Sequence, residues 1–135
     1  MDEHFIRGKR VVVGTPRGPV RTFERPELYN GSRLAIALGN RTIGTVAEGF
    51  CLFVYPLIAE LEARRFYLDV PFDICLARRE ARRPRRPSDA SFALIGEQEN
   101  AAFVLPQRDL AGVEVLDGMR PVDELVAEVL RRCGI

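Results

Sequence analysis

The two stretches TVAEGFCLF (Thr45–Phe53) and FYLDV (Phe66–Val70) decide the fold that this sequence predicts. Both are short, continuous apolar runs rich in aromatic and β-branched residues, which is typical of buried parallel strands. The segment between them, Pro56–Arg65, begins with proline, carries a leucine pair at helical spacing and ends in basic residues, so it predicts a crossover helix. We therefore expect a right-handed βαβ unit.

Two further elements are expected before this unit. Residues 10–14 and 19–23 are β-prone runs joined by Thr15–Gly18, whose proline and glycine suit a turn, so a hairpin is predicted. A short helix carrying Leu34, Ala35 and Leu38 is expected to begin with Asn30 or Ser32 as its cap and to end at Gly39-Asn40.

Four elements are expected after the unit. Asp73 is predicted to cap a helix over residues 74–83 that Pro84 stops, and Ser91–Val104 is expected to be helical and to end at Pro106. A strand at residues 113–117 precedes an amphipathic helix over residues 121–132, with acids in its first turn and arginines in its last. Together these elements predict one α/β domain with helices on the faces of a parallel sheet.

Composition limits the class of protein. The 135 residues are 47% hydrophobic and 29% charged with a net charge of +1, which describes an ordinary globular chain without a field for nucleic acid or membranes. Cys51, Cys75 and Cys133 form no C-x-x-C pair, so reduced thiols in a cytoplasmic protein are expected. The longest apolar run lies between Glu48 and Glu60, well short of the ~20 residues that span a bilayer.

Two features point to chemistry. Glu48 interrupts an apolar strand, so its carboxylate must be hydrated, bound to a metal or paired, for example with local backbone amides. Six arginines fall between Arg78 and Arg86 with one acid among them, just after the second strand, where open α/β sheets bind ligands. The arginines could instead form a solvated face or bind nucleic acid, but the aromatic interleaving of a nucleic-acid surface is absent.

The order and spacing of residues 46–53, then 66–71, then Cys75 and Arg78-Arg79 resemble the P-loop nucleoside kinases, of the nicotinamide riboside and uridine kinase type. The resemblance implies a phosphotransferase that uses ATP and Mg²⁺ to phosphorylate the 5′-hydroxyl of a nucleoside. It implies a parallel-sheet kinase fold in which the predicted hairpin is a small insertion.

The resemblance also implies roles for particular residues near the N-terminus. Asp2 matches the general base for the substrate hydroxyl, although by sequence physics alone it belongs to a frayed terminus. Phe23 matches an aromatic that stacks on the base, and Glu24 matches an acid that binds the ribose diol. The alternative for this segment is a polar connector in which Phe23 is an anchoring side chain.

The remaining implied roles lie in the βαβ unit and beyond it. Glu48 is expected beside magnesium, as a catalytic and metal-binding residue. Arg78, Arg79 and Arg82 match the arginines of the kinases' mobile lid, with Arg79 facing the nucleoside and Arg78 and Arg82 facing the transferred phosphate.

The family's phosphate-binding loop, G-x-x-x-x-G-K-[ST], has no counterpart among these 135 residues, nor do its first strand and first helix. We therefore expect no ATP turnover by this chain alone. It could be the C-terminal portion of a kinase, or a short, non-catalytic module that binds a nucleoside or phosphate; an arginine-rich nucleic-acid-binding protein is the less favoured alternative. Exposed strand edges would then promote self-association or docking to a separate N-terminal P-loop piece.

Overall fold

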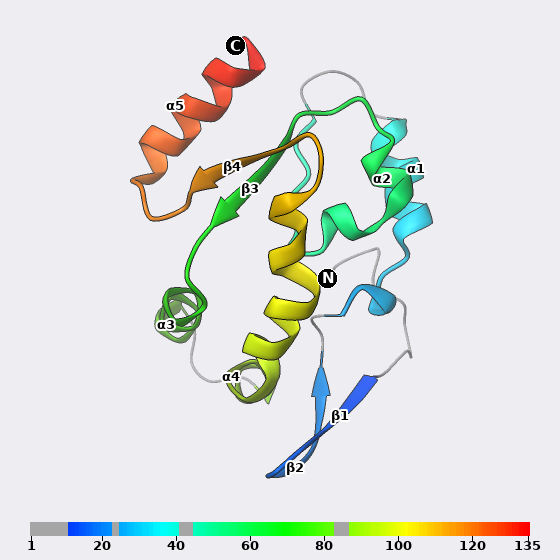
Figure 1. Ribbon diagram of the computed structural model, residues 1–135, viewed down its shortest axis with the longest axis vertical. Coiled ribbons are helices and arrows are strands. Elements are labelled where there is room, and N and C mark those ends of the chain that lie inside the picture. Colours follow the sequence, from blue (N-terminus) through cyan, green and yellow to red (C-terminus); the bar gives the residue numbers. More distant parts are fainter. Residues whose placement is uncertain (1–10, 23–24, 41–44, 83–86) are drawn as a thin grey trace.

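The computed structural model describes residues 11–22, 25–40, 45–82 and 87–135 (Figure 1). These residues form a mixed α/β structure with two small sheets, an antiparallel hairpin and a parallel pair of strands. No helix in these ranges has the length and apolar composition needed to cross a membrane. The two sheets and their helices confirm the predicted α/β class. The parallel sheet, with two strands, is smaller than expected.

The predicted hairpin is confirmed. Strands β1 (Val11–Thr15) and β2 (Gly18–Thr22) pair antiparallel with Thr15 opposite Gly18, leaving Pro16 and Arg17 as a two-residue turn. Gly18 takes φ +102°, a conformation that glycine adopts without strain. The Thr15 hydroxyl donates to the Gly18 carbonyl at 2.7 Å and closes the turn.

The next segment holds two short helical elements. A 3₁₀ turn, η1 (Pro26–Leu28), precedes α1 (Gly31–Gly39). The Asn30 side chain accepts a hydrogen bond from the Arg33 amide, so Asn30 is the cap of α1, and Asn40 ends the helix as expected.

The parallel pair consists of β3 (Arg65–Asp69) and β4 (Val113–Asp117), in register with Leu68 opposite Leu116. Both strands lie within one residue of their predicted bounds. The chain crosses between them through α3 (Phe72–Arg82), α4 (Pro87–Glu99), a π turn η3 (Asn100–Val104) and a 3₁₀ turn η4 (Leu105–Asp109). The βαβ unit therefore runs from β3 to β4 and does not use the segment before β3.

Two details of this crossover differ from expectation. Asp73 is the second residue of α3 and not its cap, so its carboxylate lies in the first turn of the helix. Pro106 was expected to stop the helix, but the chain already leaves α-helical pitch at Asn100 and continues as η4, in which proline occupies the first turn.

The predicted strand Thr45–Phe53 is wrong. Residues 45–49 are irregular, a turn follows at Phe50 and Cys51, and η2 (Leu52–Val54) is a 3₁₀ turn. A strand requires the backbone of a neighbour, and the part of the chain that the structure describes places no strand beside this segment. Val46 accordingly remains 90% exposed, although its sequence context is typical of a buried strand.

The crossover helix predicted over Pro56–Arg65 is also much shorter than expected. Helix α2 covers only Pro56–Ala59. Ile58 is its one buried residue and Leu57 is exposed, so a longer helix here would bury little apolar surface.

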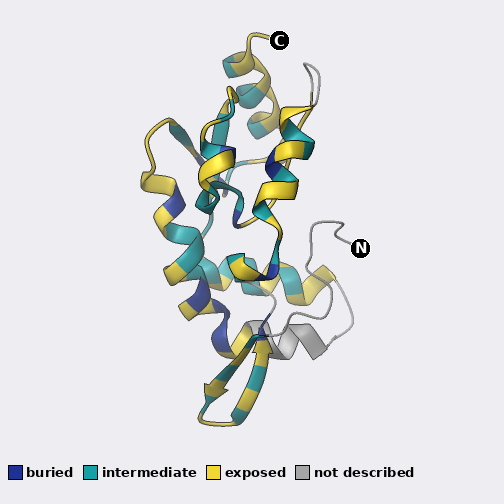
Figure 2. Cartoon of the chain, turned by 90° about the vertical axis from the view of Figure 1, so that its right-hand side faces the viewer, coloured by how far each residue is buried: buried dark blue, intermediate teal, exposed yellow. Residues whose placement is uncertain are grey.

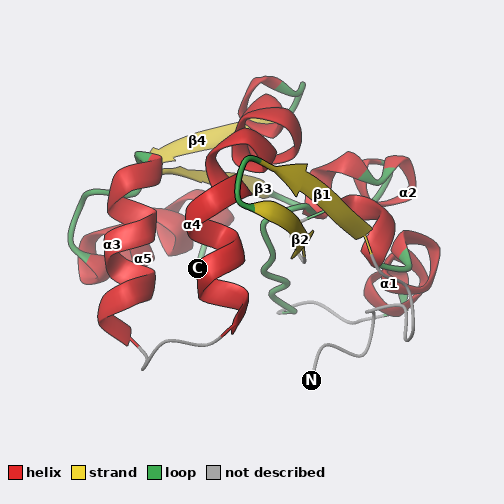
Figure 3. Cartoon of the chain, turned by 90° about the horizontal axis from the view of Figure 1, so that it is seen from below, coloured by secondary structure: helices red, strands yellow, loops and turns green. Residues whose placement is uncertain are grey.

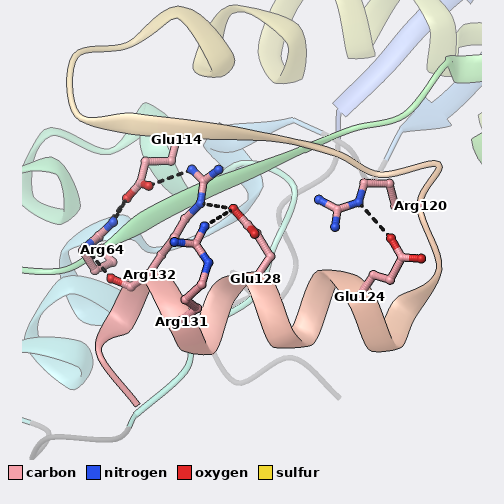
Figure 4. A network of polar contacts seen from close by, with 7 residues as sticks. All are labelled: Arg64, Glu114, Arg120, Glu124, Glu128, Arg131 and Arg132. Atoms are coloured by element: carbon pink, nitrogen blue, oxygen red, sulfur yellow. Dashed lines mark hydrogen bonds and ion pairs between the residues drawn. The ribbon is translucent and has the colours of Figure 1, made fainter.

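Helix α5 (Val122–Cys133) ends at Gly134, as predicted, but none of its residues is buried. Its attachment to the sheet is largely ionic. Glu114 on β4 accepts from Arg132 at 2.9 Å and from Arg64 ahead of β3, and Arg64 also donates to the Arg132 carbonyl at 2.6 Å (Figure 4). Glu128 in turn accepts from Arg131 and Arg132, so all three side chains are held together in the last two turns of α5.

The pleat of the sheet places α5 and η4 on opposite faces. Glu114 is three residues from Asp117, which is in register with Asp69, so Glu114 and Asp69 point to different faces. Glu114 binds α5, whereas Asp69 pairs with Arg108 of η4 at 3.6 Å. This arrangement leaves the sheet between α5 and the α3–α4 crossover (Figure 1).

The buried apolar residues are few and come from many elements: Leu28, Ala35, Cys51, Ile58, Ile95 and Leu116. Figure 2 shows them as isolated dark-blue positions among teal and yellow ones. The hairpin projects from the lower end of the molecule, away from the parallel pair (Figure 1), and Figure 3 shows the molecule from that end. The described residues thus share a thin core, which makes their buried polar contacts important for holding the parts together.

Candidate functional site

The carboxyl ends of β3 and β4 are tied together at Gly118. Its amide donates to the Asp69 carbonyl at 2.9 Å, and a Cβ at this position would lie 2.3 Å from Cγ2 of Val70. Only glycine allows this approach. Arg78 of α3 reaches the same point, where its Nη1 donates to the Gly118 carbonyl at 3.4 Å. One predicted site arginine therefore lies at the sheet edge where α/β proteins bind ligands.

The other predicted arginines lie on the same helix. Arg82 is exposed at the end of α3, and Arg79, one turn before it, is half-buried. The half-buried Cys75 thiol reports the placement of two of these arginines: burial raises its pKa, while the nearby positive charges of Arg78 and Arg82 oppose that rise. Arg78 and Arg82 follow Cys75 by three and seven residues, so helical spacing places all three on one side of α3. Because burial disfavours the thiolate, Cys75 is not a candidate nucleophile.

A buried carboxylate that the sequence analysis did not single out joins the hairpin to α4. Glu99 is only 4% exposed; it accepts a hydrogen bond from the Thr22 hydroxyl, and Arg25 Nε donates to it at 2.7 Å. Arg25 also stacks over the Phe103 ring at 5.6 Å, and the hydrogen bond to Glu99 is the main reason that its pKa is raised. Glu99 follows the buried Ile95 by four residues, and this helical spacing was the available signal.

Thr22 and Arg25 are the residues on either side of the predicted pair Phe23-Glu24. Phe23 and Glu24 themselves lie outside the described residues, as does Asp2. Both flanking residues, Thr22 and Arg25, bind the buried carboxylate of Glu99. The chain is therefore held in place just before and just after the pair.

Glu48 lies on a different part of the molecule. It is exposed and contributes to the lining of a cavity of about 470 Å³ between α1 and residues 45–55. The rest of the lining is apolar or aromatic, apart from a few hydroxyl groups: Tyr29, Leu34, Ala37, Leu38, Thr45, Val46, Ala47, Gly49, Phe50, Cys51, Leu52 and Tyr55. No residue of α3 lines this cavity, so the described structure does not bring Glu48 and the arginines into one site.

The same cavity offers little to a metal ion. Glu48 is its single acidic residue, and the described ranges contain no group of three His, Cys, Asp or Glu residues that could hold a metal. Mg²⁺ prefers six oxygen ligands, several of which are usually water or phosphate oxygens. A magnesium ion at Glu48 would therefore need most of its ligands from solvent and substrate.

One wall of the cavity is fixed by Gln107, a second residue that sequence reasoning missed. Its side chain is 3% exposed and makes three hydrogen bonds of 2.8 Å: Oε1 accepts from the Phe53 amide, and Nε2 donates to the carbonyls of Phe50 and Phe103. Nothing in the sequence marks this glutamine, because its partners at 50 and 53 are more than fifty residues away. Through it, the segment after Glu48 is fastened to η3 and η4.

Comparison with known proteins gives one significant relative. Human nicotinamide riboside kinase 2 is 34% identical over 90 residues, which cover 62% of this chain. The match lies in the C-terminal part of that kinase, and the chain spans 37% of its length. Neither a protein-family model nor a solved structure matches the chain. The chain thus has distant, partial homology to a nicotinamide riboside kinase, which confirms the resemblance drawn from the sequence.

Proposed function

We propose that this chain is the riboside-binding and phosphate-binding portion of a nucleoside kinase-like protein. Its partial homology to nicotinamide riboside kinase 2 supports the substrate class. The single observation that carries the proposal is the position of α3: Arg78 reaches the joined ends of β3 and β4 at Gly118, with Arg82 on the same side of the helix. Guanidinium groups at that edge suit phosphate oxygens, which they bind with two parallel hydrogen bonds.

The riboside would be recognised by Phe23, Glu24 and Arg79. Stacking on Phe23 would hold the base, and the carboxylate of Glu24 would accept hydrogen bonds from the ribose diol. Glu99 supports this assignment because it binds Thr22 and Arg25 and so limits the motion of the chain on both sides of the pair.

The remaining roles concern the phosphoryl group. Arg78 and Arg82 would bind the transferred phosphate, and Asp2 would accept the proton of the attacking hydroxyl. Glu48 would contribute one carboxylate ligand to Mg²⁺. ATP and Mg²⁺ would supply the phosphoryl group and its charge compensation, but a G-x-x-x-x-G-K-[ST] loop to hold the β- and γ-phosphates is absent from these 135 residues. We therefore propose that these residues alone bind ligand without turning over ATP.

Calorimetry with nicotinamide riboside and with uridine tests the substrate part. We expect the Glu24→Ala variant to bind the preferred riboside about 10- to 100-fold more weakly, because charge-assisted hydrogen bonds to the diol are lost. Glu62→Ala, an exposed glutamate outside the proposed site, is the matched control and should bind as the wild type does. Equal affinity in wild type and Glu24→Ala would refute the assignment of the diol-binding residue.

An ATP-consumption assay tests the catalytic part. The purified chain, with magnesium and several nucleosides, is expected to release no ADP above the no-enzyme rate. Magnesium-dependent kinase activity that disappears in Asp2→Ala would overturn the proposal that these residues are non-catalytic, and would show that another element binds the ATP phosphates.

A further inference from the structure

Glu99 is a buried carboxylate at which two distant parts of the chain meet. It is the last residue of α4 and is only 4% exposed. Its Oε2 accepts a hydrogen bond from the hydroxyl of Thr22, the last residue of β2, and its Oε1 accepts from Nε of Arg25 at 2.7 Å. Because each oxygen has its own donor, one carboxylate binds both residues at the same time.

The two residues that Glu99 binds are also held by other contacts. Thr22 is 2% exposed and ends strand β2, which packs against α4. The Arg25 guanidinium lies over the Phe103 ring at 5.6 Å, and the 3₁₀ turn that follows Arg25 buries Leu28 to 1% exposure. The chain is therefore held up to residue 22 and again from residue 25.

Only two residues, 23 and 24, lie between these held points. Ordering the backbone of a residue costs conformational entropy, and a short loop with both ends held has fewer conformations to lose than one with free ends. A segment that is restricted in advance loses less entropy when a ligand binds, so its affinity for that ligand is higher. A bond from Glu99 to each end is thus able to affect ligand affinity without touching the ligand.

We propose that Glu99 is a positioning residue for riboside binding, which holds Thr22 and Arg25 together and thereby restricts Phe23-Glu24 before the ligand arrives. This inference rests on the proposed function, in which Phe23 and Glu24 recognise the riboside. It adds that the affinity depends on the hairpin and on α4, neither of which carries a residue proposed to contact the ligand. By linkage, riboside binding should in turn stabilise the junction between β2 and α4.

Calorimetry with nicotinamide riboside and with uridine on a series of variants tests this role. Thr22→Val removes the hydroxyl while keeping the shape of the side chain, and should weaken riboside binding about 3- to 30-fold, because a hydrogen bond to a charged group is lost. Thr22→Ser keeps the hydroxyl and should retain most of the affinity. Glu99→Met removes both hydrogen bonds and should bind at least as weakly as Thr22→Val.

Two more variants attribute the effect to these hydrogen bonds. Glu99→Gln keeps an oxygen that can accept from Arg25 and an amide that can donate to the Thr22 hydroxyl, so it should bind more tightly than Glu99→Met. The double variant Thr22→Val, Glu99→Met should bind no more weakly than Glu99→Met alone, because the bond between the two side chains is already absent.

Glu114→Met is the matched control. Glu114 also accepts from two arginines, but it lies on β4, outside the proposed site. Its replacement should lower the free energy of unfolding and leave the riboside affinity unchanged. All affinities are measured under conditions in which urea denaturation shows each variant to be folded, so that a loss of stability alone does not change them.

Hydrogen exchange provides a second readout: added riboside should slow the exchange of amides at the ends of β2 and α4 in wild type, and less so in Glu99→Met. Equal riboside affinity in wild type, Thr22→Val and Glu99→Met would overturn the inference and leave the proposed function intact. So would a loss of affinity in Glu114→Met as large as that in Glu99→Met. A wild type that binds neither riboside would instead refute the proposed function, and with it the role of Glu99 in binding.

Discussion

Replacing Gln107 with methionine removes three hydrogen bonds while nearly keeping the volume of the side chain. Each of these bonds is 2.8 Å long and joins neutral groups, so each contributes about 1 kcal/mol net. The Phe50 and Phe103 carbonyls and the Phe53 amide would be left without these partners, and the similar shape adds little packing cost. We expect the free energy of unfolding to fall by about 2–4 kcal/mol, measured by urea denaturation followed by circular dichroism.

Gln98→Met provides the matched control for this substitution. Gln98 is exposed on α4, nine residues before Gln107, so the same chemical change there should alter the free energy of unfolding by less than about 0.5 kcal/mol. Hydrogen exchange adds a local readout, because the Phe53 amide should exchange faster in Gln107→Met than in wild type. If the two glutamine variants unfold at the same urea concentration with the same Phe53 exchange rate, the account of Gln107 as the link between residues 50–53 and η4 is refuted.

Two further predictions concern the parallel sheet. Gly118→Ala should lower the free energy of unfolding by about 1–3 kcal/mol in the same urea assay, because the added Cβ would lie 2.3 Å from Val70 and 3.1 Å from the Asp69 carbonyl oxygen. Gly14→Ala is the control, because a Cβ at Gly14 would meet open space. Equal stability of the two variants would contradict the close approach at Gly118. The hydrogen bonds from Arg64 and then Arg132 lower the pKa of Glu114 below its ordinary 4.5, so its contribution to stability is complete above pH 4.5 and is lost as the pH falls through the lower folded value. The melting temperature of Glu114→Gln should therefore fall less steeply than that of wild type as the pH drops from about 5 to about 3. If the two melting temperatures fall equally over this range, the contacts of Glu114 with Arg64 and Arg132 do not stabilise the fold.

Local sequence signals predicted the elements whose determinants are local. The turn at Pro16-Arg17 defines the hairpin, the Asn30 cap begins α1, and Gly134 ends α5, because each of these features acts within a few residues. The strand at 113–117 was found with its bounds for the same reason, since its apolar run is bracketed by glycines.

The prediction failed for elements that depend on residues far away in the sequence. Residues 45–53 have the composition of a buried strand, but composition does not supply a partner, and the described residues place none beside them. Helix α2 ends at Ala59, and among the described residues it buries only Ile58, so little packing supports a longer helix. Both errors arise from one fact, namely that β propensity and helix propensity are realised only through tertiary contacts.

The candidate site was predicted in part. The arginines of α3 follow β3 as the sequence indicated, and the structure adds the contact of Arg78 with Gly118. Glu99 and Gln107 were missed because their partners at 22, 25, 50 and 53 are between fifty and eighty residues away; the one local signal was the helical spacing of Glu99 from Ile95. The expected roles of all the site residues stay predictions, and Asp2, Phe23 and Glu24 also lie outside the described ranges.

The π turn at Asn100–Val104 lets the spacing between Glu99 and Gln107 lose one residue but not two. A π turn accommodates one residue more than the α-helix would, and each residue of an α-helix turns the chain by about 100°. Deleting a single residue from η3 would let α-helical pitch continue with little rotation of the chain beyond it, because the π turn absorbs that residue. Deleting a second residue would rotate everything beyond η3 by about 100° relative to the hairpin. Glu99 could then keep its arginine while Gln107 pointed away from residues 50–53. Lineages of this protein should therefore tolerate the loss of one residue from 100–104 but not the loss of two.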